Sequence, residues 1–76
     1  MKVTSINHEP GQYGPIWWGT ATKGDDNIEW FYEPGISLNV RREVHLGMWM
    51  PMRPTPRAIK LAVLEAVRNS KHTYLH

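Results

Sequence analysis

The chain has 76 residues, a formal net charge of +2 and no cysteine. A chain of this length forms one domain that buries only about 60 to 65% of the surface its unfolded form exposes, which predicts modest stability. Without cysteine, a disulfide framework, a thiolate metal site and a cysteine nucleophile are all excluded, and a reducing compartment is favoured. We therefore expect residues 1–76 to form a single small cytoplasmic domain.

No segment of the sequence predicts contact with a membrane. The first residues contain no apolar run of signal-peptide length, and no stretch approaches the roughly 18 apolar residues of a membrane span. Charge, in contrast, is distributed unevenly. Residues 1–35 contain two basic and five acidic side chains, whereas residues 36–76 contain seven basic and two acidic ones. This polarity predicts a basic surface for an anionic partner, or opposite ends that attract each other within or between chains.

Three segments are rich in aromatic and β-branched residues, which is typical of strands. They comprise residues 16–22, 28–33 and 36–46, and turn residues separate them. Residues 3–7 are a candidate fourth strand, followed by a loop that closely spaced prolines and glycines enforce. The role of the first 15 residues is otherwise left open. The sequence thus predicts an antiparallel sheet of three or four strands.

The two adjacent indoles of Trp17 and Trp18 point to opposite faces of a strand, so only one of them can enter a given core. If Thr22 pairs with Ile28, then Trp18 meets Tyr32. In the next hairpin, pairing Tyr32 with Ile36 requires a bulge or a loop of odd length near residues 33–35. These pairings predict that Trp18 points inward and Trp17 outward, with a core face of Ile16, Trp18, Thr20, Trp30, Tyr32, Ile36, Leu38 and Val40.

A helix is predicted at about residues 56–71, after a proline-rich crossover at residues 47–55. Thr55 is a good N-cap, and Pro56 suits the first helical position because its missing N–H costs nothing there. Apolar residues then recur at helical spacing on one stripe, which consists of Ile59, Ala62, Val63, Ala66 and Val67. The expected fold is therefore α+β, with the C-terminal helix covering one face of the sheet.

The leading functional hypothesis is nucleic-acid binding. The residues expected to contact phosphates are Arg41, Arg42, Arg53, Arg57, Lys60, Arg68 and Lys71. Trp17 and Phe31, on the outer face of the sheet, would stack on unpaired bases, which contributes about 1 to 3 kcal/mol per base. Glu29 and Glu33 oppose this interpretation, because they place negative charge on the same face. The outer face could instead be covered by the N-terminal segment or by a second chain.

The alternative hypothesis is a protein-interaction module, either an inhibitor or an adaptor, that binds an acidic protein or forms a homodimer. Leu61 and Leu64 lie among basic residues on the helix face opposite the core stripe, so both charge and apolar area are available there. Flexible methionines suit an adaptable interface. The expected interface residues are Leu61, Leu64, Met48, Trp49, Met50 and Met52. Simple filling of the gap between strand and helix would explain the methionines equally.

The sequence contains no motif that predicts catalytic activity. No glycine-rich phosphate loop and no nucleophile motif is present, and the pair Glu29 and Glu33 has little room for a water-excluding cleft in a domain of this size. We expect a non-enzymatic binding or regulatory module with no catalytic residues, no metal site and no cofactor.

Overall fold

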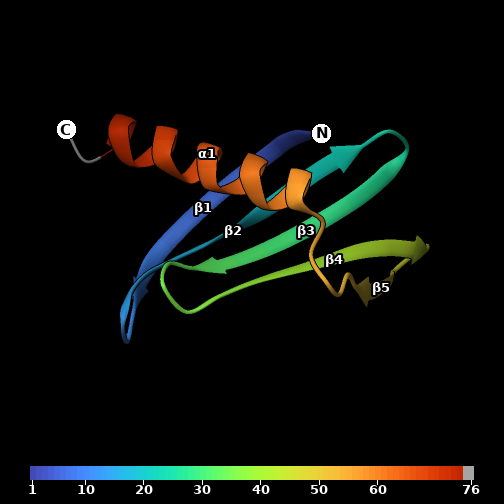
Figure 1. The fold of residues 1–76 in the computed structure, drawn as a ribbon, viewed down its shortest axis with the longest axis horizontal. Coiled ribbons are helices and arrows are strands. Elements are labelled where there is room, and N and C mark those ends of the chain that lie inside the picture. The colour runs from blue at the N-terminus through green and yellow to red at the C-terminus, as the bar shows by residue number, and fades with distance from the viewer. Residues whose placement is uncertain (75–76) are drawn as a thin grey trace.

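The computed structural model describes the backbone of residues 1–74 and the side chains of residues 1–70. One five-stranded antiparallel sheet, with its strands in chain order, is covered on one face by a C-terminal helix (Figure 1). The elements are β1 (Lys2–Gly11), β2 (Gly14–Lys23), β3 (Asp26–Glu33), β4 (Ser37–His45), β5 (Met48–Pro51) and α1 (Arg57–Tyr74). The predicted α+β class is confirmed. The sheet is larger than the three or four strands expected.

The two edge strands account for the difference in strand number. β1 pairs with β2 from Lys2 to Gly11, through the segment predicted to be a loop. β5 lies within the predicted crossover of residues 47–55 and pairs with β4. Pro10 and Pro51 lie in these strands, and an edge strand tolerates proline because one of its sides makes no ladder hydrogen bonds. Pro10 and Pro51 therefore lie within the two edge strands, where the sequence predicted a loop and a crossover.

The predicted inward position of Trp18 is wrong. Trp17 pairs with Tyr32 and is only 2% exposed, whereas Trp18 pairs with Phe31 on the opposite face. The cause is the β2–β3 turn, where Lys23 pairs with Asp26 across a loop of two residues. Gly24 begins this loop with a φ of +62°, as tight hairpin loops require. The predicted Thr22–Ile28 pair requires a loop that shifts the register by one residue, and this shift assigned every side chain of β2 to the wrong face.

The β3–β4 loop has the predicted odd length. Glu33 pairs with Ser37 across three residues, and the Ile36 N–H donates to the Glu33 carbonyl at 2.9 Å. Tyr32 therefore lies opposite Leu38 and not opposite Ile36, a shift of two residues that keeps the faces of β4 as predicted. Ile36 itself lies in the loop and is 57% exposed, so its predicted place in the core is wrong.

The core lies between the sheet and α1. Three helix residues and five strand residues are buried in it: Ile59, Val63 and Val67 with Trp17, Ala21, Ile28, Trp30 and Val40. The predicted helical stripe is thus confirmed for its three largest members, while Ala62 and Ala66 are half-buried beside them. Ile16 and Thr20 were predicted on the core face together with Trp18. Like Trp18, they share the opposite face because β2 has the other register.

The helix begins one residue after the predicted start, and Pro56, not Thr55, lies at the N-cap. The Pro56 carbonyl accepts the N–H groups of Ile59 and Lys60, each at 3.1 Å, and Arg57 is the first residue of α1. In the described part of the chain, α1 continues to Tyr74, three residues beyond the predicted end. No helix among the described residues combines the length and the apolar character needed to span a bilayer.

Candidate nucleic-acid interface

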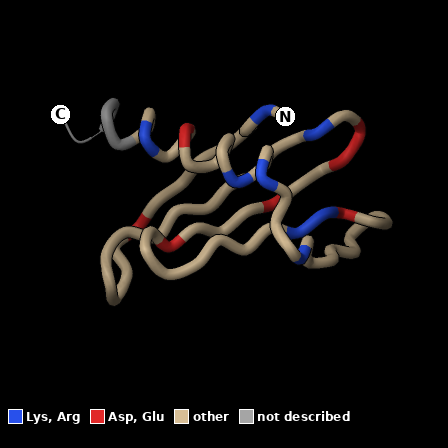
Figure 2. Tube along the Cα trace, viewed as in Figure 1, with Lys and Arg blue, Asp and Glu red and all other residues tan. Residues whose placement is uncertain are grey.

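Four basic residues lie along β4, the segment before α1 and the first turns of α1, where these parts of the backbone approach one another (Figure 2). All four are exposed, and none of them pairs with a carboxylate of the described residues. The first turn of α1 contains no acidic residue that would neutralise them. The N-terminus of a helix also carries a partial positive charge. We call Arg42, Arg53, Arg57 and Lys60 the cationic surface.

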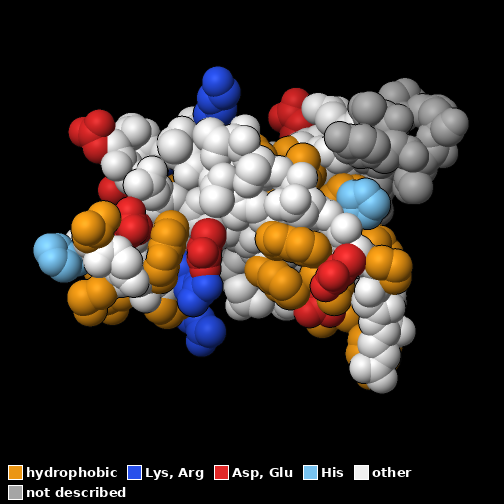
Figure 3. Space-filling view, turned by 180° about the vertical axis from the view of Figure 1, so that it is seen from behind, with side chains coloured by type: hydrophobic (Ala, Val, Ile, Leu, Met, Phe, Trp, Pro, Cys, Tyr) orange, Lys and Arg blue, Asp and Glu red, His pale blue; other side chains and the backbone are white. Residues whose placement is uncertain are grey.

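No element of the described chain covers the face of the sheet opposite α1 (Figure 1 and Figure 3). At its centre, Trp18 on β2 and Phe31 on β3 lie directly opposite each other. Trp18 is half-buried and Phe31 is 40% exposed, so both rings can be reached from solvent. This face therefore presents an aromatic pair that packing of the monomer leaves available.

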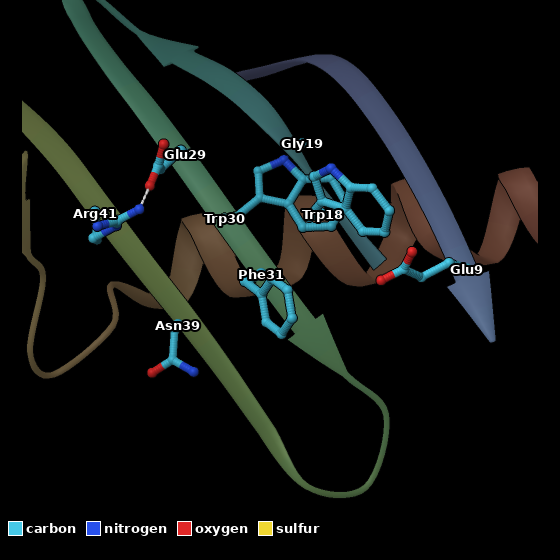
Figure 4. Close-up of a pocket in the computed structure, with 8 residues that line it drawn as sticks. All are labelled: Glu9, Trp18, Gly19, Glu29, Trp30, Phe31, Asn39 and Arg41. Carbon is cyan, nitrogen blue, oxygen red and sulfur yellow. Dashed lines mark ion pairs between the residues drawn. The ribbon is translucent and has the colours of Figure 1, made fainter. Parts of the chain in front are cut away.

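The aromatic pair lies in a shallow hollow of about 320 Å³, which we call the aromatic hollow (Figure 4). Four neighbouring strands contribute to it, since Glu9 comes from β1 and Asn39 and Arg41 come from β4. The residues that line it are Glu9, Trp18, Gly19, Glu29, Trp30, Phe31, Asn39 and Arg41.

Charge within the aromatic hollow is arranged across the strands. Arg41 forms an ion pair with Glu29 on the neighbouring strand, and both side chains remain partly exposed. Glu9 lies across the aromatic rings from this pair (Figure 4). Two carboxylates against one guanidinium leave the hollow slightly negative, so a phosphate group is disfavoured inside it. A neutral ring that carries hydrogen-bond donors fits this environment better.

A smaller hollow at the edge of β4 connects the aromatic hollow to the cationic surface. β5 ends at Pro51, opposite Arg41, and the Met52 N–H still donates to the Val40 carbonyl at 2.8 Å, so among the described residues no strand lies beside residues 37–39 at this edge of β4. The space there, about 260 Å³, is lined by Asn39 and Arg41 on one side and by Arg53 on the other. Arg53 also lines a third hollow, of about 380 Å³, together with Arg42. The surface is therefore continuous around the edge of the sheet.

The structure brings together part of the predicted phosphate-binding set. Arg41 lies on the open face, whereas the four residues of the cationic surface lie on or near the helix side. Arg68 is exposed farther along α1, and Lys71 lies outside the residues whose side chains are described. Phe31 is on the outer face as predicted. Trp17 cannot stack on a base, because it is buried beneath α1, and Trp18 is the indole that lies on the outer face.

The predicted protein-interface residues differ in exposure. Leu61 is exposed, but Leu64 and Trp49 are half-buried, and Met52 packs against the core. Met48 and Met50 are exposed on the β4–β5 hairpin, where two residues that were not predicted add to them. These are Val44 and Leu46, the latter 89% exposed at the turn.

The β4–β5 turn is held by one carboxylate. Glu43 accepts hydrogen bonds from the Asn27 side-chain amide at 3.1 Å and from the Gly47 backbone N–H at 3.2 Å. These two bonds lower the pKa of Glu43 below its ordinary value, the Asn27 bond contributing most. Glu43 therefore has a structural role in the turn and does not oppose the cationic surface through an ion pair.

Sequence reasoning missed Glu9 and Trp18 as members of the site. The signal for Trp18 was present, because a glycine followed by an aspartate between two strand-like segments indicates a two-residue hairpin loop. Glu9 carried no such signal, because its strand was predicted to end before it. Among the described residues, no cluster of three histidine or acidic side chains could hold a metal ion. No protein-family model, curated protein or solved structure matches the chain.

Proposed function

We propose that this protein is a non-enzymatic module that binds nucleic acid through the phosphate backbone. The observation that carries the proposal is the cationic surface, where four exposed basic side chains from three segments have no acidic partner in the described structure. Each unpaired cation can replace the counterions of one phosphate, and the release of those counterions drives binding. Arg42 and Arg53 line the same hollow, and their guanidinium groups suit bidentate contacts with phosphate oxygens.

The salt dependence of binding tests this proposal directly. Four phosphate contacts predict that log K falls with log salt with a slope of about −3 to −4, depending on whether the ligand is single- or double-stranded. We expect Arg57→Glu with Lys60→Glu to reduce affinity for nucleic acid at least tenfold at about 50 mM salt, because repulsion replaces two contacts. Fluorescence anisotropy with labelled oligonucleotides measures both quantities.

A matched variant controls for net charge. Lys2→Glu with Lys23→Glu changes the charge equally, on the strands at the other edge of the sheet. We expect this control to lower affinity much less than the Arg57 and Lys60 variant. Equal losses in both variants, or a wild-type protein that does not bind nucleic acid at 50 mM salt, would contradict the proposal.

A second candidate function is self-association through the β4–β5 hairpin. One observation favours it, namely that four large apolar side chains within seven residues are exposed there: Val44, Leu46, Met48 and Met50. Flexible methionines adapt to a partner surface, and burial of each such side chain in a dimer contributes about 1.5 to 3 kcal/mol. A second copy of the chain offers the same apolar hairpin, as a two-fold interface requires.

Solution mass tests this candidate. If the hairpins associate, sedimentation gives twice the mass of one chain, and Leu46→Ser with Met48→Ser returns the protein to the monomer while it stays folded. Ile36→Ser with Tyr13→Ser is the control, because these residues are equally exposed in other loops. A monomeric wild-type protein would remove this candidate.

A further inference from the structure

We propose that the aromatic hollow takes one unpaired base of a single-stranded nucleic acid, whose backbone continues around the edge of β4 to the cationic surface. This inference rests on the proposed function and specifies the ligand as single-stranded. It also joins two surfaces that lie on opposite sides of the sheet.

The first support is the aromatic pair itself. Trp18 and Phe31 lie on adjacent strands, which run about 4.8 Å apart, and both line the same hollow, so together they offer apolar area for one base. Stacking on such rings accepts any base, because every base has a π-face. The hollow, at about 320 Å³, has the size of a small ligand pocket. A base paired and stacked within a duplex cannot enter it.

The second support is the direction of charge across the hollow. Arg41 lies on β4, nearest the route to the cationic surface, and Glu9 lies on β1, at the far side of the rings (Figure 4). A nucleotide fits this arrangement when the edge of its base points toward Glu9 and its phosphate lies outside the hollow, beyond the Arg41–Glu29 ion pair and toward Arg53. The Glu9 carboxylate can then accept a hydrogen bond from an exocyclic amino group, as acidic side chains do from cytosine.

The third support is the open edge of β4, where no strand of the described chain lies beside residues 37–39. The hollow at this edge shares Asn39 and Arg41 with the aromatic hollow, and Arg53 with the third hollow beside the cationic surface. A flexible single strand can follow this curved path, whereas a stiff duplex can contact only the cationic side. The geometry therefore favours a single strand over a duplex.

Two variants of the aromatic pair test the inference. We expect Trp18→Ala and Phe31→Ala each to weaken binding of a short oligo(dC) strand between about 5-fold and 100-fold, the range that loss of one stacked base gives. Binding of a blunt duplex of mixed sequence should change less than 2-fold. Tyr13→Ala is the matched control, because it removes an exposed aromatic ring from a loop outside the hollow. Circular dichroism verifies that each variant is folded.

The preference of the protein for one base over another gives a second test, because a merely structural role of Glu9 would not change this preference. Oligo(dC) carries the exocyclic amino group that oligo(dT) lacks, so the wild-type protein should bind oligo(dC) more tightly. Glu9→Gln should reduce this preference, because an amide can pair with either base. No preference in the wild type, or one that Glu9→Gln leaves unchanged, would overturn the assignment of the base edge to Glu9.

The outcomes separate this inference from the proposed function. Equal affinity for single strand and duplex, with no effect of Trp18→Ala or Phe31→Ala, would overturn the inference while salt-dependent binding through Arg57 and Lys60 would still support the proposed function. Failure to bind either ligand would overturn both. A selective loss of single-strand binding in both aromatic variants supports the inference.

Discussion

Trp17→Ala is expected to lower the free energy of unfolding by about 3 to 5 kcal/mol, and Trp18→Ala by only about 1 kcal/mol. The two residues are adjacent and chemically identical, but Trp17 is buried beneath α1 and Trp18 lies on the open face. Removal of the Trp17 indole leaves a cavity among residues that include Trp30 and Val63, whereas water can fill the space left by Trp18.

The expected loss of unfolding free energy in Trp17→Ala is large relative to the total stability of the domain. A chain of this size has a total stability on the order of 4 to 11 kcal/mol, so the Trp17 variant should lose a large part of it. Urea unfolding followed by circular dichroism measures both variants without relying on the altered fluorophores. If Trp18→Ala proved the more damaging change, Trp18 and not Trp17 would face the helix, and the aromatic hollow would be wrongly placed.

Gly19→Ala is expected to destabilise the protein by about 2 to 3 kcal/mol, an overpacking effect. A Cβ atom at Gly19 would overlap the Ser5 carbonyl oxygen of β1 and would lie 3.0 Å from Cζ2 of Trp30. Both neighbours are fixed, since Ser5 belongs to the strand ladder and the Trp30 Nε1 donates to the Thr20 carbonyl at 3.3 Å. The backbone of β1 would therefore have to move away from β2.

A second glycine provides the control for Gly19. At Gly24 an added Cβ would meet no atom within 4 Å, and only the φ of +62° opposes a side chain. We expect Gly24→Ala to cost about 1 kcal/mol, less than Gly19→Ala, when both are measured by thermal unfolding. An equal loss of stability from the two substitutions would show that the backbone of β1 moves away from Gly19 at little energetic cost. In that case the position of Glu9 relative to the aromatic hollow would also be loosely held.

Local signals in the sequence were sufficient for the helix and for the later strands. Pro56 predicted the start of α1 to within one residue, because its missing N–H suits the beginning of a helix and this depends only on neighbouring residues. The alternation in β4 predicted that Leu38 and Val40 face the core, since a strand has a period of two wherever it pairs. The cations of the proposed interface were also evident from composition alone.

The candidate site was predicted only in part, because its aromatic residues depend on strand parity. A change of one residue in a hairpin loop exchanges the faces of the whole strand, so the choice between Trp17 and Trp18 depended on the length of the loop at Gly24. The sequence contained a turn signal there, but pairing the apolar residues appeared equally consistent with a longer loop. Phe31 lies on the outer face as predicted, because its own strand was assigned the correct faces.

The sequence by itself determined the α+β class, the helix with its buried stripe and the separation of acidic from basic residues, because each depends on local pattern or composition. Only the tertiary structure decided which indole is buried, that β1 and β5 extend the sheet, and that Glu9 and Arg41 lie on either side of one aromatic pair. These features depend on how consecutive strands pair with one another. The spacing of residues within a single strand carries no information about which residues of the next strand lie opposite. The length of each hairpin loop sets this register, and the register decides which side chains form the candidate site.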